Sequence, residues 1–337
     1  PGQGGLVTPG TRVPDLVSTV DMAATSLSLA GLPVPGYMDG VVFLGPAKEK
    51  REYVTASRDR GDETFDRIRA IRTKNYKYIR NFYPELPYTQ YNHYKFNSPE
   101  LYGNLNVMMG MYEKGMLDPV QSLFFGSVKP EEELYDVRSD PWEVNNLAGD
   151  PEYKEVLERM RAENRAWMAE IRDVGLIPES MYSEFSGEGS MYDYMRSEEC
   201  PFDELLEAAE TATMPEADLK AYSKYLSHKH PAMRYWGATG MLIHLDVAAL
   251  QVETLIKASK DKSSAVAVIA AEALYALGQK EAALDSYIRI LTDPGYDLTD
   301  RNFALNSIDG GHVSDPDLQK VVKDFYEATM DGKEGFA

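Results

Sequence analysis

The sequence predicts an α+β protein in which a small antiparallel sheet packs on helices and is followed by an all-α segment of helical repeats. Two runs that alternate apolar and polar residues, RIRAIRT (67–73) and YKYIRNF (76–82), flank Lys74-Asn75 and indicate a β-hairpin. ELYDV (133–137) then ends a further strand, and helical periodicity dominates from residue 204 onward. These three observations determine the predicted class.

The chain is predicted to consist of three consecutive segments. Residues 1–178 hold the sheet and end on an amphipathic helix, for which Asp150 is the expected N-cap and Pro151 the first helical residue. Residues 179–203 are rich in Ser, Glu, Gly, Met and Tyr without clear periodicity, which predicts a linker. Residues 204–337 are predicted to be all-helical.

A weak internal repeat runs through the third segment. HPAMRYWGATGMLIHL, KSSAVAVIAAEALYAL and LTDRNFALNSI each place a short loop before a helix of small and apolar residues. Arg234, Ala267 and Arg301 fall at equivalent positions, 33 and 34 residues apart. A period in the thirties built from helix pairs predicts an α-solenoid. The stretch H-P-x-x-R-Y-W (230–236) resembles HEAT-type repeats.

The composition excludes several classes of protein. With 43% hydrophobic and 26% charged residues, the chain is expected to be globular rather than disordered. Its single cysteine excludes an internal disulfide and a cysteine-based zinc site. The net charge of −19 argues against nucleic acid and anionic membranes as partners. No apolar run approaches the roughly 20 residues that a membrane span needs.

The first residues, PGQGGLVTPGTRVPD, lack an initiator methionine and the basic and apolar regions of a signal peptide. Their Pro and Gly content is typical of a loop. We therefore expect the chain to be a fragment of a longer protein, whose targeting signal would lie elsewhere.

Charge is unevenly distributed along the chain. Eight Lys and Arg residues lie between Arg58 and Arg80, against four Asp and Glu residues. A basic region on an acidic protein suits a small anionic ligand better than a polyanion. The alternative is that these cations line the solvent face of the hairpin.

The loop ASRDRGDETFDRIR (56–69) is the candidate binding site. Arginine offers a planar fork of N–H donors to an anionic group, and carboxylates accept hydrogen bonds from sugar hydroxyls. The candidate substrate-binding residues are Arg58, Asp59, Arg60, Asp62, Glu63 and Arg67. The alternative interpretation is a surface loop held by salt bridges.

Other motifs carry no predicted chemistry. Cys200, which precedes Pro201, is interpreted as a structural thiol. His228 and His230 could form a metal pair, but no third ligand is evident, so capping or packing is the preferred interpretation. We predict no catalytic residue and no metal ligand in this chain.

Three ordered motifs resemble the C-terminal part of a formylglycine-dependent sulfatase of the alkaline-phosphatase-like superfamily. They are PGTRVPDLVSTVDMAATSLSLAGLPVP (9–35), RAIRTKNYKYIRNFYPELPY (69–88) and ELYDVRSDPWEVNNLAGDPEY (133–153). The first departs from the family by placing Ala24-Thr25 where Pro-Thr is usual. The resemblance covers about residues 1–180. Within the superfamily, this part of the chain is most similar to the N-sulfoglucosamine sulfohydrolase-like branch and to bacterial glycan sulfatases.

The resemblance implies a hydrolase that acts on sulfate esters or sulfamates of a sulfated saccharide. It implies calcium, and a formylglycine made from the Cys or Ser of C/S-x-P-x-R. Cys200 does not stand in such a motif. We therefore expect both groups in a missing N-terminal catalytic core, and expect this chain alone to be inactive, with the loop Arg58–Glu63 and Arg67 contacting substrate. Bacterial relatives imply a periplasmic or secreted location.

A second hypothesis belongs to a different class. The chain would be a non-catalytic binding or scaffold module, in which the HEAT-like repeats bind a protein partner or a glycan.

Overall fold

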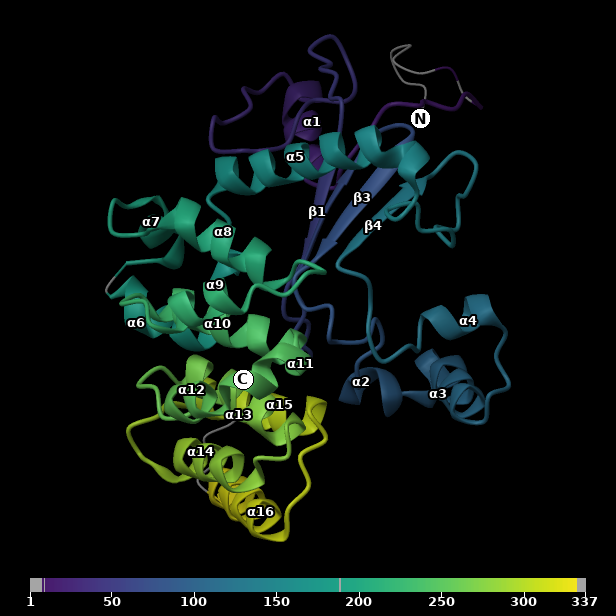
Figure 1. Ribbon diagram of the computed structural model, residues 1–337. Helices are drawn as coiled ribbons and strands as arrows, with labels where there is room; N and C mark the ends of the chain where they lie inside the picture. Colours follow the sequence, from purple (N-terminus) through teal and green to yellow (C-terminus); the bar gives the residue numbers. More distant parts are fainter. Residues whose placement is uncertain (1–7, 9, 188, 332–337) are drawn as a thin grey trace. The chain divides into compact units, whose positions relative to one another are not determined.

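The computed structural model describes residue 8, residues 10–187 and residues 189–331 (Figure 1). The chain divides into two compact units that interleave along the sequence. The first contains the residues up to Arg58, Ile68–Arg80 and Glu132–Ala166, and the second contains Asp59–Arg67, Asn81–Glu131 and the residues from Trp167 onward. The division into 1–178, 179–203 and 204–337 stays a prediction, and the compact units follow different bounds.

The first unit is built on a four-stranded antiparallel sheet. Its strands are β1 (Val54–Arg58), β2 (Ile68–Arg72), β3 (Tyr76–Asn81) and β4 (Glu132–Asp136), in the order β1-β2-β3-β4. Thr73 closes the β2–β3 turn, because its N–H donates to the Tyr76 carbonyl at 2.8 Å. The predicted hairpin and the small antiparallel sheet are confirmed.

Helix α5 (Lys154–Ile171) packs on this sheet, as Figure 1 shows. Leu157 and Met160 of α5 form one apolar cluster with Ile71, Tyr78 and Leu134 of the strands. Ala70, Glu133 and Tyr135, which neighbour Ile71 and Leu134 in the strands, are buried as well, so burial does not alternate along β2 and β4.

A charged contact joins the same two layers. Arg161 of α5 makes a two-pronged ion pair with Glu132 of β4, with both N–O distances at 2.6 Å. Tyr78 donates its hydroxyl hydrogen to the same carboxylate. The start of α5 is also as predicted, because Asp150 accepts from the Glu152 amide at 2.9 Å and Pro151 opens the first turn.

Helix α1 (Asp21–Leu29) belongs to the first unit. The buried carboxylate of Asp21 accepts from the Ser18 amide at 2.8 Å and from the Val41 amide at 2.9 Å. It also pairs with Arg51. Asp21 therefore ties the start of the helix to two loops, and the helix begins at this residue.

The second unit is helical. Its insertion between β3 and β4 holds α2 (His93–Phe96), α3 (Pro99–Glu113) and α4 (Pro119–Leu123). The later helices, which Figure 1 shows stacked from teal to yellow, are α6 (Tyr182–Ser186), α7 (Met191–Arg196), α8 (Phe202–Ala212), α9 (Leu219–Leu226), α10 (Pro231–Ile243), α11 (Leu245–Ala248), α12 (Val252–Ala258), α13 (Ser264–Ala276), α14 (Lys280–Thr292), α15 (Leu298–Gly310) and α16 (Pro316–Asp331).

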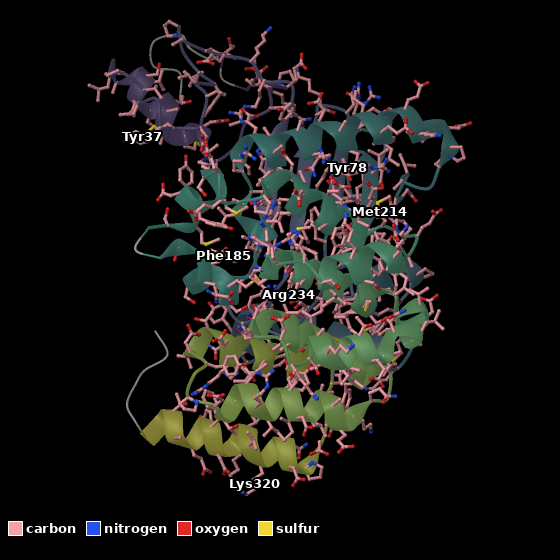
Figure 2. The ribbon with its side chains drawn as sticks, turned by 60° about the vertical axis from the view of Figure 1, so that its left-hand side comes forward. Tyr37, Tyr78, Phe185, Met214, Arg234 and Lys320 are labelled. Carbon is pink, nitrogen blue, oxygen red and sulfur yellow. The ribbon has the colours of Figure 1, made fainter. Side chains whose placement is uncertain are left out.

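These helices pack in two layers. Helix α13 packs on α10 and α15 within one layer. In the other layer α9 packs on α10, α12 and α14 pack on α13, and α16 packs on α14. Arg234 of α10 lies among the stacked helices (Figure 2) and forms a two-pronged ion pair with Asp261, with N–O distances of 2.7 and 2.8 Å. Asp261 lies in the loop before α13, so the ion pair joins neighbouring helices of one layer.

The predicted linker 179–203 is folded into the core of the second unit. It forms a 3-10 turn, η4 (Glu179–Met181), followed by α6 and α7. Met181, Met191, Met195 and Cys200 are buried in the apolar core of this unit. Their spacing follows no single period because the segment changes direction at each short helix, and so the sequence pattern did not reveal the burial.

Among the described residues, no single helix combines the length and the apolar character needed to cross a membrane. The bent pair Pro231–Ile243 and Leu245–Ala258 meets these two criteria only when its members are taken together, across a bend of 102°.

A buried polar network crosses the helical layers. Ser307 of α15 donates to Glu272 of α13 at 2.6 Å, and the hydroxyl groups of Ser307 and Tyr287 of α14 lie 2.9 Å apart. Burial raises the pKa of Glu272 to about 7, against the smaller lowering effect of the Ser307 hydrogen bond. The carboxyl group is therefore held protonated in the folded protein at mildly acidic pH.

We predict that this network makes stability depend on pH. The pKa of Glu272 is higher in the folded protein than its ordinary value of 4.5, so the unfolded chain loses this proton first as pH rises. Stability should fall between about pH 5 and pH 8, by up to about 3 kcal/mol from this group. Glu272→Gln should remove that dependence and be more stable than the wild type at pH 8.

The measurement is the free energy of unfolding in urea at several pH values. The difference between the wild type and Glu272→Gln isolates this group from other titrating residues such as Glu85 and His230. Glu281→Gln, at an exposed position of α14, is the matched control. Parallel pH profiles for the wild type and Glu272→Gln would contradict the prediction.

Candidate functional site

The candidate loop, Asp59–Arg67, contains a tight turn. The Gly61 amide donates to the Thr64 carbonyl at 2.8 Å, and the Thr64 amide donates back to the Gly61 carbonyl at 3.0 Å. Asp62 has a φ of 51°, a left-handed conformation that Asp tolerates better than most residues. The turn places Asp62 and Glu63 at its exposed tip.

Asn92 holds the two carboxylates of this turn. Its buried side chain donates from Nδ2 to Asp62 Oδ2 and to Glu63 Oε2, both at 3.1 Å. The His93 amide also donates to Glu63. Asn92 Oδ1 accepts from the Lys95 amide at 3.0 Å and so caps α2. One asparagine therefore fixes both the acidic turn and the start of the neighbouring helix.

Arg60 is the accessible cation of the loop. Its Nε donates to Glu179 Oε2 at 2.6 Å, and its Nη1 donates to the Asp62 carbonyl at 2.7 Å. Its side chain is 46% exposed. A guanidinium has five N–H donors, so these two bonds hold Arg60 in place and leave donors directed to solvent.

Arg67 lies at the other end of the loop and is buried. Its guanidinium lies 5.4 Å from the ring centre of Tyr83 and 6.0 Å from that of Trp236, and its Nε donates to Asp59 Oδ1 at 3.3 Å. Burial lowers the pKa of Arg67, but Tyr83, Asp59 and other neighbours raise it by more, so the group stays charged. We interpret Arg67 as a residue that positions the loop.

A buried ion pair anchors the residue next to Arg67. Lys129 Nζ lies 3.0 Å from Asp66 Oδ1, and both side chains are fully buried. Lys129 also donates to the Leu86 carbonyl at 3.1 Å. Gln90 donates to the Phe65 carbonyl at 2.7 Å. The exposed tip of the loop therefore stands on a base with fixed geometry.

The structure brings five of the six predicted site residues together in one loop: Asp59, Arg60, Asp62, Glu63 and Arg67. Arg58 belongs to the first unit, where it ends β1 opposite Ile68 and its carbonyl accepts from Arg69 Nη1 at 3.2 Å. Sequence reasoning did not select Asn92, Glu179 or Tyr83. Only Asn92 left a local signal, as an Asn directly before a short helix.

Cys200 does not have the surroundings of a reactive residue. Its side chain is buried with Sγ 3.7 Å from Met195 Sδ, and burial raises the pKa of the thiol to about 11. Within the described part of the chain, no group of three or more His, Cys, Asp or Glu side chains is placed to hold a metal ion.

The histidine pair has a structural role. His230 Nδ1 accepts from the Ala232 amide at 3.2 Å at the start of α10, and its Nε2 lies 2.8 Å from the Tyr194 hydroxyl. Its ring stacks on Phe185 at 4.9 Å, and burial lowers the pKa of His230 to about 4. The interpretation of His228 and His230 as capping and packing residues is confirmed, since His228 Nδ1 accepts from the His230 amide at 3.1 Å.

Comparison with known proteins finds sulfatases that are similar to half of the chain. An ulvan-active sulfatase of Formosa agariphila is 42% identical over 171 residues, which are 50% of this chain and 28% of that protein. Half of the chain is homologous to sulfatases. A second ulvan-active sulfatase of the same bacterium is 32% identical over 176 residues, 50% of this chain and 32% of that protein. No family model matches.

The sulfatase similarity is limited in extent. This chain spans less than a third of the length of either relative. A solved 2-O GAG sulfatase aligns with 50% of this chain and 28% of its own, at 24% identity and a TM-score of 0.33. A structure in complex with D-glucosamine-2-N,6-O-disulfate aligns with 44% of this chain and 23% of its own, at 19% identity and a TM-score of 0.27. Such low TM-scores carry no argument about function.

We predict that Asn92→Ala releases the acidic turn of this sulfatase-related chain. The substitution removes the amide donor of Asp62 and Glu63 together with the cap of α2, so the turn should open more often. Hydrogen exchange of the Gly61 and Thr64 amides should become about tenfold faster, for a loss of about 1.4 kcal/mol in local stability.

Hydrogen exchange measured by NMR checks this prediction. Asn106→Ala is the matched control, because Asn106 is exposed and donates only to the Phe96 carbonyl, at 2.8 Å. Unchanged exchange at Gly61 and Thr64 in Asn92→Ala would show that Asn92 does not hold the turn.

Proposed function

We propose that this chain is the C-terminal part of a sulfatase that acts on a sulfated saccharide, and that the loop after β1 contributes substrate contacts. The observation that carries the proposal is the 42% identity to an ulvan-active sulfatase over half of the chain. The exposed cation and carboxylates of the loop support it, because they offer complementary groups to a sulfated sugar. The linkage cleaved would be a sulfate ester or a sulfamate.

The proposed roles differ between the loop residues. Arg60 would donate to the oxygens of a sulfate group, since an Arg fork matches an oxyanion. Asp62 and Glu63 would accept from sugar hydroxyls on neighbouring positions, because carboxylates repel sulfate but bind hydroxyl groups. Asp59 and Arg67 would keep the loop in shape. Arg58, at the end of β1, stays a predicted substrate contact.

We propose that formylglycine and calcium, if this protein uses them, are held outside this chain. The residues described here do not fit either group, because Cys200 is buried away from any C/S-x-P-x-R motif and no suitable set of metal ligands is present among the described residues. No chemical step is therefore assigned to these residues. The isolated chain would be inactive, and the whole protein would be periplasmic or secreted.

We also propose that the stacked helices from α8 to α16 are HEAT-like repeats that bind a protein or glycan partner. Two polar contacts between neighbouring helices support this reading. Arg234 of α10 pairs with Asp261 before α13, and Ser264 of α13 donates to Asp300 of α15. Contacts between neighbouring helices suit a repeat architecture, in which each repeat contacts only its neighbours.

Substitution of Arg60 tests the proposed sulfate contact. Arg60→Ala should weaken binding of a sulfated ulvan oligosaccharide by about tenfold or more, because a charge-assisted hydrogen bond is lost. Binding of the desulfated oligosaccharide should not change. Isothermal titration calorimetry measures both, and Arg159→Ala, at an exposed position of α5, is the matched control. Equal affinities in Arg60→Ala and the wild type would remove Arg60 from the site.

Sulfate release separates the enzyme from the scaffold hypothesis. The full-length protein should release sulfate from the same oligosaccharide, whereas this chain alone should release none. If the full-length protein binds the oligosaccharide but never releases sulfate, the protein is a non-catalytic binding module.

A further inference from the structure

Two tyrosines stand exposed beside the acidic turn. Tyr91, just before α2, is 52% exposed, and Tyr94, within α2, is 56% exposed. Buried aromatic rings are normal in a folded protein, whereas neighbouring exposed rings need a reason.

Tyr91 is exposed but fixed in position. Its ring lies 5.1 Å from that of Phe96, and its hydroxyl accepts from Asn97 Nδ2 at 3.1 Å. Asn97 Nδ2 also lies 2.8 Å from His93 Nδ1. Phe96 thus supports the ring, and the exposed half of the residue is available to a ligand. A ring that is already ordered loses little conformational entropy when a ligand binds.

The tyrosines are coupled to the proposed sulfate-binding loop. Asn92 stands directly after Tyr91 in the chain and bonds to both Asp62 and Glu63. Consecutive Cα atoms lie about 3.8 Å apart, so the backbone of Tyr91 lies next to the residue that holds the acidic turn. The same hydrogen bonds that shape the turn therefore set its position relative to Tyr91.

The chemistry of the segment favours a sugar over an apolar protein surface. In QYNHYKFN (90–97) aromatic residues alternate with amides, a histidine and a lysine. A pyranose presents an apolar C–H face and a rim of hydroxyl groups, which matches flat rings interspersed with hydrogen-bonding side chains. Lys95 is exposed in the middle of the segment and suits a further anionic substituent.

We infer that Tyr91 and Tyr94 form a stacking platform for a pyranose ring of the oligosaccharide. The inference rests on the proposed function for the choice of a sulfated glycan as ligand. One sugar ring stacks on the platform. Asp62 and Glu63 accept hydrogen bonds from sugar hydroxyl groups, and Arg60 contacts a sulfate group on the adjoining sugar. The platform makes the chain select an oligosaccharide over a monosaccharide, since a single ring cannot occupy both places.

Titration with an ulvan tetrasaccharide and its chemically desulfated counterpart tests the platform. Tyr91→Ala and Tyr94→Ala should each weaken binding of both ligands by about tenfold, because stacking does not depend on the sulfate group. Tyr91→Phe should retain most of the affinity, because it keeps the ring. Tyr326→Ala, at a 57% exposed position of α16, is the matched control and should bind like the wild type.

The outcomes separate this inference from the proposed function. Loss of affinity for the desulfated tetrasaccharide in the tyrosine variants supports the platform, even if Arg60→Ala has no effect on the sulfated one. Wild-type affinity for both tetrasaccharides in Tyr91→Ala and Tyr94→Ala would overturn it, even if Arg60→Ala weakens the sulfated one. Far-ultraviolet circular dichroism confirms that each variant is folded, and Tyr94→Ala provides the test if Tyr91→Ala is not.

Discussion

The buried ion pair between Asp66 and Lys129 is the interaction on which the candidate site depends. Both side chains are withdrawn from water, so each needs the other to offset its desolvation. Removing one partner of such a pair typically costs about 3–5 kcal/mol, because the remaining charge stays buried alone. Lys129 lies near the end of the insertion that carries α2, α3 and α4, and Asp66 lies near the end of the loop after β1. The pair therefore fixes the loop relative to the insertion.

The loop combines a fixed base with an exposed tip. Asp66 and Arg67 are buried at the base, where Tyr83 and Trp236 enclose the guanidinium of Arg67. Arg60, Asp62 and Glu63 are exposed at the tip, and Glu179 and Asn92 restrict their positions. Binding sites need side chains that are accessible yet ordered, and a loop supported by a second set of hydrogen bonds meets both conditions. This division explains why charges of similar type along one loop have different roles.

Local sequence patterns predicted the helices and strands. Features that depend on residues far apart in the chain were not predicted. Alternation around Lys74-Asn75 predicted the hairpin, and Asp150-Pro151 predicted the start of α5, because both signals lie within a few residues. The sulfatase resemblance was confirmed over half of the chain by the 42% identity to an ulvan-active sulfatase. By contrast, Arg67 was chosen as a ligand for its charge, and its burial against Trp236 comes from a residue far along the chain. The segment 179–203 also escaped prediction, because buried methionines on short helices leave no period.

The interleaving of the two units constrains the order in which the chain can fold. Strands β3 and β4 pair only after residues 82–131 close between them, a non-local step that carries loop-closure entropy and slows folding. Arg67 can contact Trp236 only after α10 has been synthesised. Until then, the charged side chain of Arg67 lacks one of the two aromatic rings that lie against it in the folded protein. Helix α10 therefore completes the surroundings of Arg67 late in synthesis. A chain that ends before α10 would contain Asn92, Lys129 and Glu179, but its Arg67 would lack the ring of Trp236.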